Sequence, residues 1–304
     1  MRRSTVELVR RVHAAEPGFS SYRLRVKAKM TLAGLRLGGR LGRLVAPGAG
    51  AYARYLAERP EIIGILIWPY QSAFWDVEKR TERLLNHFDR VDETDGAFAF
   101  GTDEQIVLAD LTQHLPGLTL SLDQPVWFMR EGSLTLNLFL GDFRAYTVAF
   151  SLYRGANGAL EIVIGSVQGR NTDEALEMYR NITKALFGLR PRDFLNRMLS
   201  VVARSLGADR VLAVSQAARH HRHPYFAGVK DFPNDYDEIW AELGGARLDD
   251  EFYTLPLTPE RRSLDLIKPR KRSMYRKRYE FLDDVEQIVA DAVRAGRPVP
   301  KFDR

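Results

Sequence analysis

The sequence predicts an α+β protein, in which a helical, basic N-terminal region precedes a mixed, mostly antiparallel sheet flanked by helices. Apolar residues recur at helical spacing up to residue 95, and from about residue 97 they alternate with polar residues. A period near 3.6 is typical of amphipathic helices, and a period of 2 is typical of strands. A third observation, an apolar stripe behind a basic start, predicts a long closing helix over 270–293. We therefore divide the 304 residues into a helical region, 1–95, and a sheet domain, 96–304.

Residues 22–45 form a basic amphipathic segment that has two interpretations. One helical face would carry Met30, Leu37, Leu41, Leu44 and Val45, and another Arg36, Arg40 and Arg43. Such a helix can lie on an anionic membrane surface, and residues 1–50 carry a net charge of +9. The glycines of the segment weaken the helix and would equally permit close packing against another element. Core packing and peripheral contact with the inner membrane are both kept as hypotheses.

Further helices are expected at 4–15, 51–58 and 73–90, with the apolar stretch 62–68 between the last two. Pro47-Gly48-Ala49-Gly50 interrupts the helical region. His87 lies on the helix at 73–90, where a lone histidine is more typical of a structural role than of catalysis.

The sheet domain begins with an antiparallel meander and continues with a helical crossover. Alternation predicts strands near 106–111, 117–122, 133–140, 145–153 and 160–167. Asn157-Gly158 between the last two strands is a strong hairpin signal. Two helices follow, separated by residues 188–191, and then a short apolar strand at 211–214 that is typical of a sheet interior. A helix at 235–242 and a strand at 251–255 come next.

The glycine turn after the strand at 160–167 is a candidate site for an anionic group. It reads Gln168-Gly169-Arg170-Asn171 and leads directly into a helix. A helix N-terminus attracts phosphate, a glycine lets backbone approach a ligand, and arginine adds charge-assisted donors. Arg190 and Arg192, near another helix end, could face the same side of the sheet. An ordinary capped turn, with arginines that balance a helix dipole, is the alternative.

Two side chains are candidate general bases because each could accept a proton near the expected cleft. Glu131 stands just before a predicted strand, and an exposed carboxylate at a strand edge is the alternative. His221 belongs to a histidine-rich tetrapeptide in which one imidazole could act near neutral pH. No metal is expected, because the adjacent His220 and His221 rarely reach one ion, and Arg219 and Arg222 would repel a cation.

A second basic cluster opens the closing helix. Its candidate residues for an anionic ligand are Lys271, Arg272, Tyr275 and Arg276. Cations at a helix N-terminus are disfavoured by the helix dipole, which favours a bound anion there, whether a ligand, a lipid or the protein's own acids. Nucleic acid is an unlikely partner, because no recognisable reader module accompanies the cluster.

Composition restricts the remaining classes. The sequence contains no cysteine, which excludes disulfides, thiolate metal sites and a cysteine nucleophile. No signal peptide is recognisable, and the longest apolar run, 62–68, is too short to span a bilayer. We therefore expect a cytoplasmic protein that can associate peripherally with the inner membrane.

Part of the sheet domain resembles the GNAT N-acyltransferases. The similarity is carried by the order of its elements and by two motifs, Leu206-Gly-Ala-Asp-Arg-Val-Leu-Ala-Val214 and Tyr236-Asp-Glu-Ile-Trp-Ala-Glu-Leu-Gly-Gly245. In that superfamily the glycine turn holds the coenzyme A pyrophosphate, and Gln168-Gly169-Arg170 stands at the corresponding place. The superfamily's loop usually carries two glycines where this chain has one. The resemblance therefore implies an acyl-CoA or another phosphorylated donor.

At whole-chain level the sequence resembles the VirK/YbjX family. The motifs that carry this similarity are Arg130-Glu-Gly-Ser-Leu-Thr-Leu136, Ile164-Gly-Ser-Val-Gln-Gly169, Ala185-Leu-Phe-Gly-Leu-Arg-Pro-Arg192, Tyr236-Asp-Glu-Ile-Trp240 and Lys271-Arg-Ser-Met-Tyr-Arg-Lys-Arg-Tyr279. The resemblance implies a bacterial protein linked to the cell envelope, antimicrobial-peptide resistance and virulence. Combined with the first resemblance, it implies an acyl or aminoacyl transferase that acts on an envelope component. The alternatives are a non-catalytic protein that binds anionic lipid or a protein partner in a basic cleft and, less favoured, nucleic-acid binding.

Overall fold

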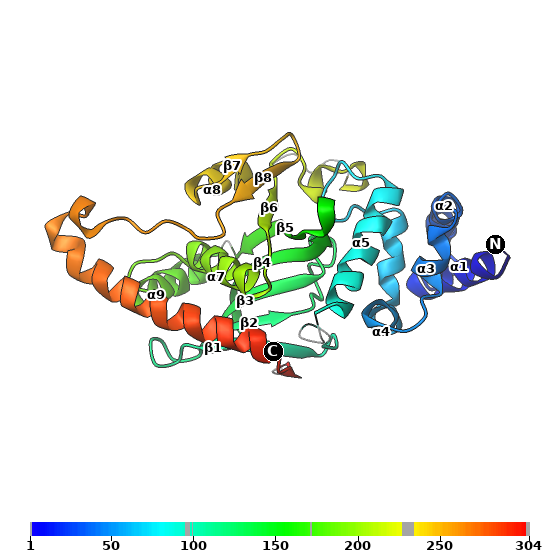
Figure 1. Ribbon diagram of the computed structural model, residues 1–304. Helices are drawn as coiled ribbons and strands as arrows, with labels where there is room; N and C mark the ends of the chain where they lie inside the picture. Colours follow the sequence, from blue (N-terminus) through cyan, green and yellow to red (C-terminus); the bar gives the residue numbers. More distant parts are fainter. Residues whose placement is uncertain (1, 95–97, 99, 171, 227–233, 302–304) are drawn as a thin grey trace.

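The computed structural model describes residues 2–94, 98, 100–170, 172–226 and 234–301. Within this part of the chain, one large sheet separates the N-terminal helices from the helices of the second half (Figure 1). The arrangement confirms the predicted α+β class, with helices at the N-terminus and a long helix near the C-terminus.

In the described residues the sheet has nine strands, in the order β7-β8-β6-β5-β4-β3-β2-β1-β9. Their bounds are β1 (Glu104–Asp110), β2 (Leu118–Asp123), β3 (Leu134–Leu140), β4 (Phe143–Arg154), β5 (Leu160–Gly169), β6 (Arg210–Val214), β7 (Ala246–Arg247), β8 (Phe252–Leu255) and β9 (Val299–Pro300). Only the β5–β6 pair is parallel. The predicted meander is thus confirmed, and the sequence reading missed the two-residue edge strands β7 and β9.

Alternation along the meander gives the sheet one apolar and one polar face. The leucines of β3 lie on the apolar face, together with Tyr146 of β4, which is the register partner of Leu138. On the other face, directly paired polar residues form a row across four strands: Ser121, Asn137, Thr147 and Gln168. This polar row ends at the candidate site described below.

The parallel β5–β6 connection runs through two helices, α6 (Asp173–Ala185) and α7 (Pro191–Ser205). The break between them contains Phe187 and Gly188, which have φ angles of +52° and +82°. Such left-handed backbone ends a helix, so the predicted split is confirmed. The closing helix α9 (Pro269–Ala295) packs on α7 and β1, and α8 (Tyr236–Glu242) connects β6 to the strands beyond it.

Helix α5 (Val77–Asp92) packs against the second half of β4, where β4 continues beyond Phe150, the last of its residues that pair with β3. The predicted helix began at residue 73, but Asp76 caps the helix by accepting a hydrogen bond from the N–H of Lys79 at 2.7 Å. His87 is buried, and its Nδ1 accepts a hydrogen bond from the N–H of Leu152 at 3.1 Å. Leu152 lies on β4 beyond the residues that pair with β3, so the imidazole bonds a backbone group that β3 does not reach. Burial lowers the pKa of His87 to about 3, so the neutral ring has the expected structural role.

The N-terminal region consists of α1 (Arg2–Ala15), α2 (Ser21–Leu35), α3 (Arg40–Val45), α4 (Ala51–Glu58) and the 3-10 helix η1 (Pro60–Leu66). The segment 22–45 is therefore two helices, with Gly38 at a φ of +56° between them. Its predicted apolar face is buried in the core, at Met30, Leu37, Leu41, Leu44 and Val45. Core packing is thus confirmed for these residues, and they are not available to a membrane.

One cluster of buried apolar side chains extends from Leu8 of α1 to Val293 of α9. It joins the helical region to the sheet, and the N-terminal helices contribute to the same cluster as β3 and α7. The division into 1–95 and 96–304 stays a prediction.

Candidate acid–base site

The candidate site lies where β5 and β6 separate. The two strands pair only from Glu161 to Ile164, opposite Arg210 to Ala213, and β5 then continues to Gly169 without β6. Ligand sites in sheets with parallel strands commonly lie beyond the carboxyl ends of such strands. Here the opening is occupied by polar side chains from three segments of the chain.

Four side chains meet there: Glu131 from the β2–β3 loop, Gln168 from β5, and His220 and His221 from the 3-10 helix η3 (His220–Arg222). Nε2 of Gln168 donates to Oε1 of Glu131 at 3.2 Å, and Nε2 of His220 lies 3.3 Å from the same oxygen. The centroids of the two imidazole rings lie 3.7 Å apart, and the ring planes are tilted by 45° to each other. The structure thus brings together both predicted bases, and it adds Gln168, which was predicted to hold a phosphate.

Burial dominates the electrostatics of this cluster. It raises the pKa of Glu131 to about 7, against smaller opposing effects of the Gln168 hydrogen bond and of Arg130 and Arg219. It also lowers the pKa of His220 well below its ordinary value and that of His221 to about 4, and neighbouring positive charges add to both shifts. Near pH 7 both imidazoles are therefore neutral, and Glu131 is the group that gains or loses a proton.

The flanking arginines are held by aromatic rings. The guanidinium of Arg130 lies 4.7 Å from the ring centroid of Trp68, and that of Arg219 lies 3.8 Å from the ring of Tyr236. Cation–π contacts of this kind fix a positive charge without neutralising it. Both arginines can therefore stabilise negative charge on Glu131 when its proton leaves.

A strained glutamine supports the loop that carries Glu131. Gln71 is fully buried with a φ of +53°, and its N–H donates to the carbonyl of Arg130 at 2.7 Å. Its Nε2 donates to the carbonyl of Val163 at 2.8 Å, which connects the loop to β5. A non-glycine residue in this backbone region persists only where its surroundings fix it. The position of Glu131 is thus set by contacts distant in the sequence.

Glu131, His220 and His221 could also present ligands to one cation, because one ligand atom from each lies within 4.8 Å of the others. This geometry differs from the expectation that two adjacent histidines do not reach one point. The positive charges of Arg130 and Arg219 oppose a cation here. The expectation of a site without metal stays a prediction.

Tyrosine side chains lie against the glycine of the turn that the sequence predicts as an anion cradle. A Cβ on Gly169 would lie 2.7 Å from the hydroxyl oxygen of Tyr179, so the space above the glycine is already filled. The same hydroxyl accepts the N–H of Arg170 at 2.6 Å, and the Arg170 guanidinium lies over the ring of Phe143. Asn171 lies outside the described residues. At Gly169 and Arg170 the turn is therefore covered by the protein's own tyrosine.

Arg190 and Arg192 do not lie with Gln168. They line a groove on the apolar face of the sheet beside Tyr146, whereas Gln168 points to the polar face. Successive residues of a strand point to opposite faces, so a glutamine next to Gly169 cannot share that glycine's side. The set predicted to hold one donor is thus divided between the two faces of the sheet.

The basic start of α9 is partly engaged by the protein itself. Nε of Arg272 donates to the carbonyl of Ile267 at 3.0 Å, and the ring of Tyr275 lies 4.2 Å below the guanidinium of Arg278. Lys271 and Arg276 are exposed. In the part of the chain that the structure describes, no acidic side chain forms an ion pair with these two.

Sequence reasoning missed Gln71, and of the adjacent histidines it selected His221 and not His220 as a candidate base. The polar residues 71 and 72 within an otherwise apolar stretch, 62–75, were an available signal. A buried polar residue needs partners, so such an interruption marks a packed polar contact. No local pattern could show that this contact would be with the loop of Glu131.

These observations define an α+β protein with a buried carboxyl of raised pKa at a strand opening. Residues 49–291 match the model of the family described as "Protein of unknown function (DUF535)", so the chain belongs to this family. It is the same VirK/YbjX family that the sequence motifs resemble. No solved structure matches the chain.

Three bacterial relatives are uncharacterised proteins. Two are from Haemophilus influenzae: one is 35% identical over 43% of each chain, and the other is 33% identical over 61% of this chain and 62% of the relative. The matches thus span less than two thirds of these two relatives. A third, from Escherichia coli, carries the name "Uncharacterized protein YbjX" and is 26% identical over 79% of this chain and 74% of the relative.

None of the helices in the described part of the chain is both long enough and apolar enough to span a bilayer.

Proposed function

We propose that this protein transfers an acyl or aminoacyl group to an acceptor from the bacterial cell envelope, and that Glu131 exchanges the acceptor's proton. The observation that carries the proposal is a buried carboxyl, next to a neutral imidazole, at the opening between β5 and β6. General bases are most effective when they titrate near the working pH. The resemblance to acyltransferases, which rests on sequence, supplies the reaction class.

The chemistry that we propose has one proton transfer and one bond exchange. The nitrogen or oxygen of the acceptor attacks the carbonyl carbon of the donor, and its proton passes to the carboxylate of Glu131. The donor's leaving group departs with the bonding electron pair and then takes a proton. Arg130 and Arg219 would stabilise the carboxylate before it accepts, and His220 would hold it in place.

A donor screen tests the proposal. An acyl-CoA thioester, or another phosphorylated acyl donor, should raise the thermal stability of the protein. A donor concentration about 100-fold above Kd should add about 2.7 kcal/mol to the free energy of unfolding. With an amine acceptor, release of the leaving group should then rise with pH through about 7. Stabilisation without any transfer would favour a binding protein without catalysis, and an unchanged melting temperature with every donor would contradict the transferase.

We also propose that the protein lies against the cytoplasmic face of the inner membrane, through the outward side of α2. Leu24, Leu32 and Leu35 recur at helical spacing there and are 50%, 62% and 48% exposed. The helix has four basic residues and no acidic one. Apolar side chains flanked by cations are typical of helices that lie in an anionic membrane surface. The membrane side of this segment is thus opposite to the face that its sequence suggested.

Exchange of Leu32 for glutamate is expected to reduce binding to phosphatidylglycerol vesicles at least tenfold in flotation experiments. The change removes apolar area from the membrane side of α2 and adds a repelled charge. Leu266→Glu is a matched control, because Leu266 is 82% exposed on the 3-10 helix η5 (Leu264–Leu266), far from α2 in the sequence. Equal losses in both variants, or no binding by the unaltered protein, would contradict the assigned surface.

A further inference from the structure

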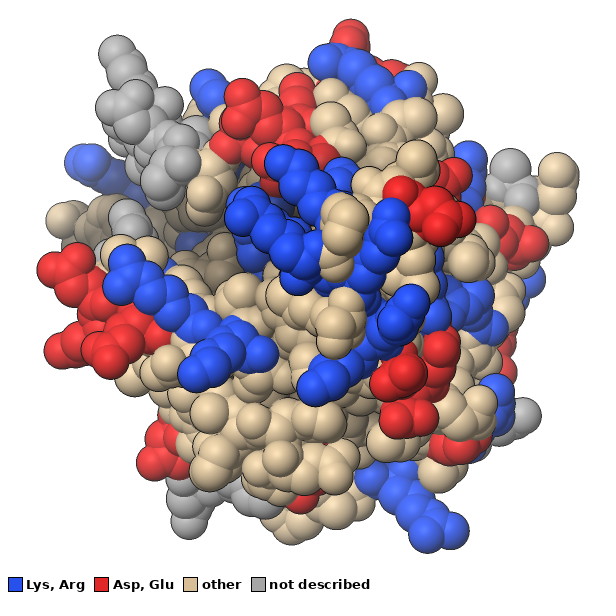
Figure 2. Space-filling view, turned by 90° about the vertical axis from the view of Figure 1, so that its left-hand side faces the viewer, with Lys and Arg blue, Asp and Glu red and all other residues tan. Residues whose placement is uncertain are grey.

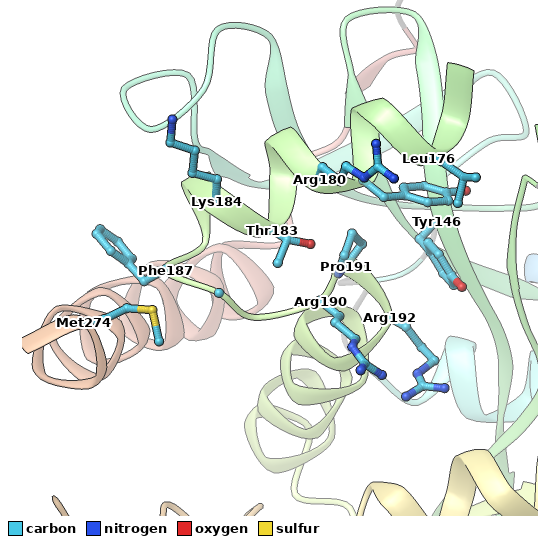
Figure 3. A pocket seen from close by; sticks show the side chains of 12 residues that line it. Tyr146, Leu176, Arg180, Thr183, Lys184, Phe187, Arg190, Pro191, Arg192 and Met274 are labelled. Carbon is cyan, nitrogen blue, oxygen red and sulfur yellow. The ribbon is translucent and has the colours of Figure 1, made fainter. Parts of the chain in front are cut away.

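A groove of about 780 Å³ lies on the apolar side of the sheet, between α6, the start of α7 and the first turns of α9 (Figure 3). Its floor is formed by aromatic and aliphatic side chains: Tyr146, Leu176, Tyr179, Phe187, Pro191 and Met274. Leu176 is 47% exposed although it stands among apolar neighbours. The groove is therefore an apolar surface that the described part of the chain leaves open.

Cations border this groove. Arg180 stands on one side of it and Arg190 and Arg192 on the other, and Lys184 continues the α6 side. Among the residues that the structure describes, none of Arg180, Lys184 and Arg190 forms an ion pair, whereas Arg192 pairs with Asp193 at 3.0 Å and also with Glu242. Figure 2 shows the side of the molecule where α9 begins, with Lys and Arg gathered over its middle.

The backbone adds to this positive potential. Arg190 occupies the N-cap position of the 15-residue helix α7, and its side chain makes no capping hydrogen bond. The positive end of a helix dipole disfavours arginines at that end, so Arg190 and Arg192 are placed against the local field. Asp193 and Glu242 already compensate Arg192, so an anion between Arg180 and this helix end would chiefly face the guanidinium groups of Arg180 and Arg190, with Arg192 beside them.

We propose that the groove binds a single-chain amphipathic anion, with its alkyl chain along the apolar floor and its headgroup between Arg180, Arg190 and Arg192. The proposal does not rest on acyl transfer, because the groove and Glu131 lie on opposite faces of the sheet. A phosphate and a carboxylate share the chemistry of the headgroup, and the two must be separated by experiment.

Isothermal titration with alkyl phosphates of six to twelve carbons, each below its micelle concentration, tests the proposal. Each added methylene should tighten binding by up to about fourfold, until the alkyl chain is longer than the apolar floor of the groove. Inorganic phosphate should bind far more weakly than decyl phosphate, and decanoate shows whether a carboxylate serves equally well. Equal binding of a neutral alkyl glucoside, or affinity independent of chain length, would overturn the proposal.

Two variants assign the site. Arg180→Glu should weaken the binding of decyl phosphate at least tenfold, because it reverses the charge beside the headgroup. Leu176→Gln should weaken the binding of long alkyl chains more than that of short ones. Arg54→Glu makes the same charge change on an exposed position of α4 and should leave affinity unchanged. An equal loss in Arg54→Glu, or full affinity in Arg180→Glu with a native circular dichroism spectrum, would show that the groove is not the site.

Discussion

Replacing Glu131 by glutamine is expected to lower the transfer rate by about 10²- to 10⁴-fold, because the amide cannot accept the acceptor's proton. The variant keeps the size of the side chain and can still hydrogen-bond with Gln168. The rate of the unaltered protein should rise with pH through about 7, and the residual rate of the variant should lose this dependence. Initial rates from pH 5.5 to 8.5 with the donor found by screening provide the measurement.

The same variant has a second readout that needs no substrate. Burial raises the pKa of Glu131 above its unfolded value, so the folded state binds more protons between about pH 4.5 and 7. Stability is therefore lost as pH rises through this window, by up to roughly 3 kcal/mol for a shift of this size. Glu131→Gln should lack this loss in urea titrations at pH 5 and 8. An unchanged pH dependence would show that Glu131 does not titrate as its burial implies.

Glu161→Gln is the matched control for this variant. Glu161 is another buried carboxyl on β5, and it pairs with Arg210 instead of joining the cluster. Its exchange should lower stability, because it leaves Arg210 without its carboxylate, while transfer activity remains. A similar loss of activity in both variants would indicate that any damage to β5 abolishes activity.

Replacing Gly165 by alanine is expected to destabilise the protein by about 3 kcal/mol and to disrupt the acid–base site. Gly165 lies at a bulge of β5, and a Cβ there would collide with the carbonyl oxygen of Glu131. Because the colliding atoms belong to the backbone, the loop of Glu131 must move. Urea denaturation measures the loss, and the pH dependence of stability should flatten because Glu131 leaves its buried position.

Ser166→Ala is the control at the neighbouring position. Ser166 is buried, and its hydroxyl has no hydrogen-bond partner among the described residues. Removing an unsatisfied hydroxyl is close to neutral or slightly stabilising. A Gly165→Ala protein as stable as Ser166→Ala, with an unchanged titration of Glu131, would contradict the close approach of the two segments.

The secondary structure could be predicted well because its signals are local. The leucines of β3 alternate with polar residues as far as Asn137, Asn157-Gly158 closes the hairpin, and Gly188 ends α6. Each of these signals acts over a few residues, so the sequence contains them completely. For residues 22–45 the sequence left both core packing and membrane contact open, since helical spacing identifies an apolar face without showing what covers it.

The candidate site was only partly predictable, because its members are far apart in the chain. Glu131 and His221 were each identified by residue type, but nothing local places them beside Gln168. Gly169 was interpreted as a phosphate cradle, and the structure fills that space with Tyr179, which lies ten residues further along the chain. Whether a glycine faces a ligand or a side chain is decided by packing.

By itself, the sequence determined the fold class, the order of the meander and crossover, and the family to which the chain belongs. Only the tertiary structure decided that Glu131 is buried and that Gln168 and Arg190 lie on opposite faces of the sheet. The physical reason is the range of the interactions. Periodicity and turn chemistry act between near neighbours, whereas burial and the resulting pKa of Glu131 depend on segments that only folding brings together.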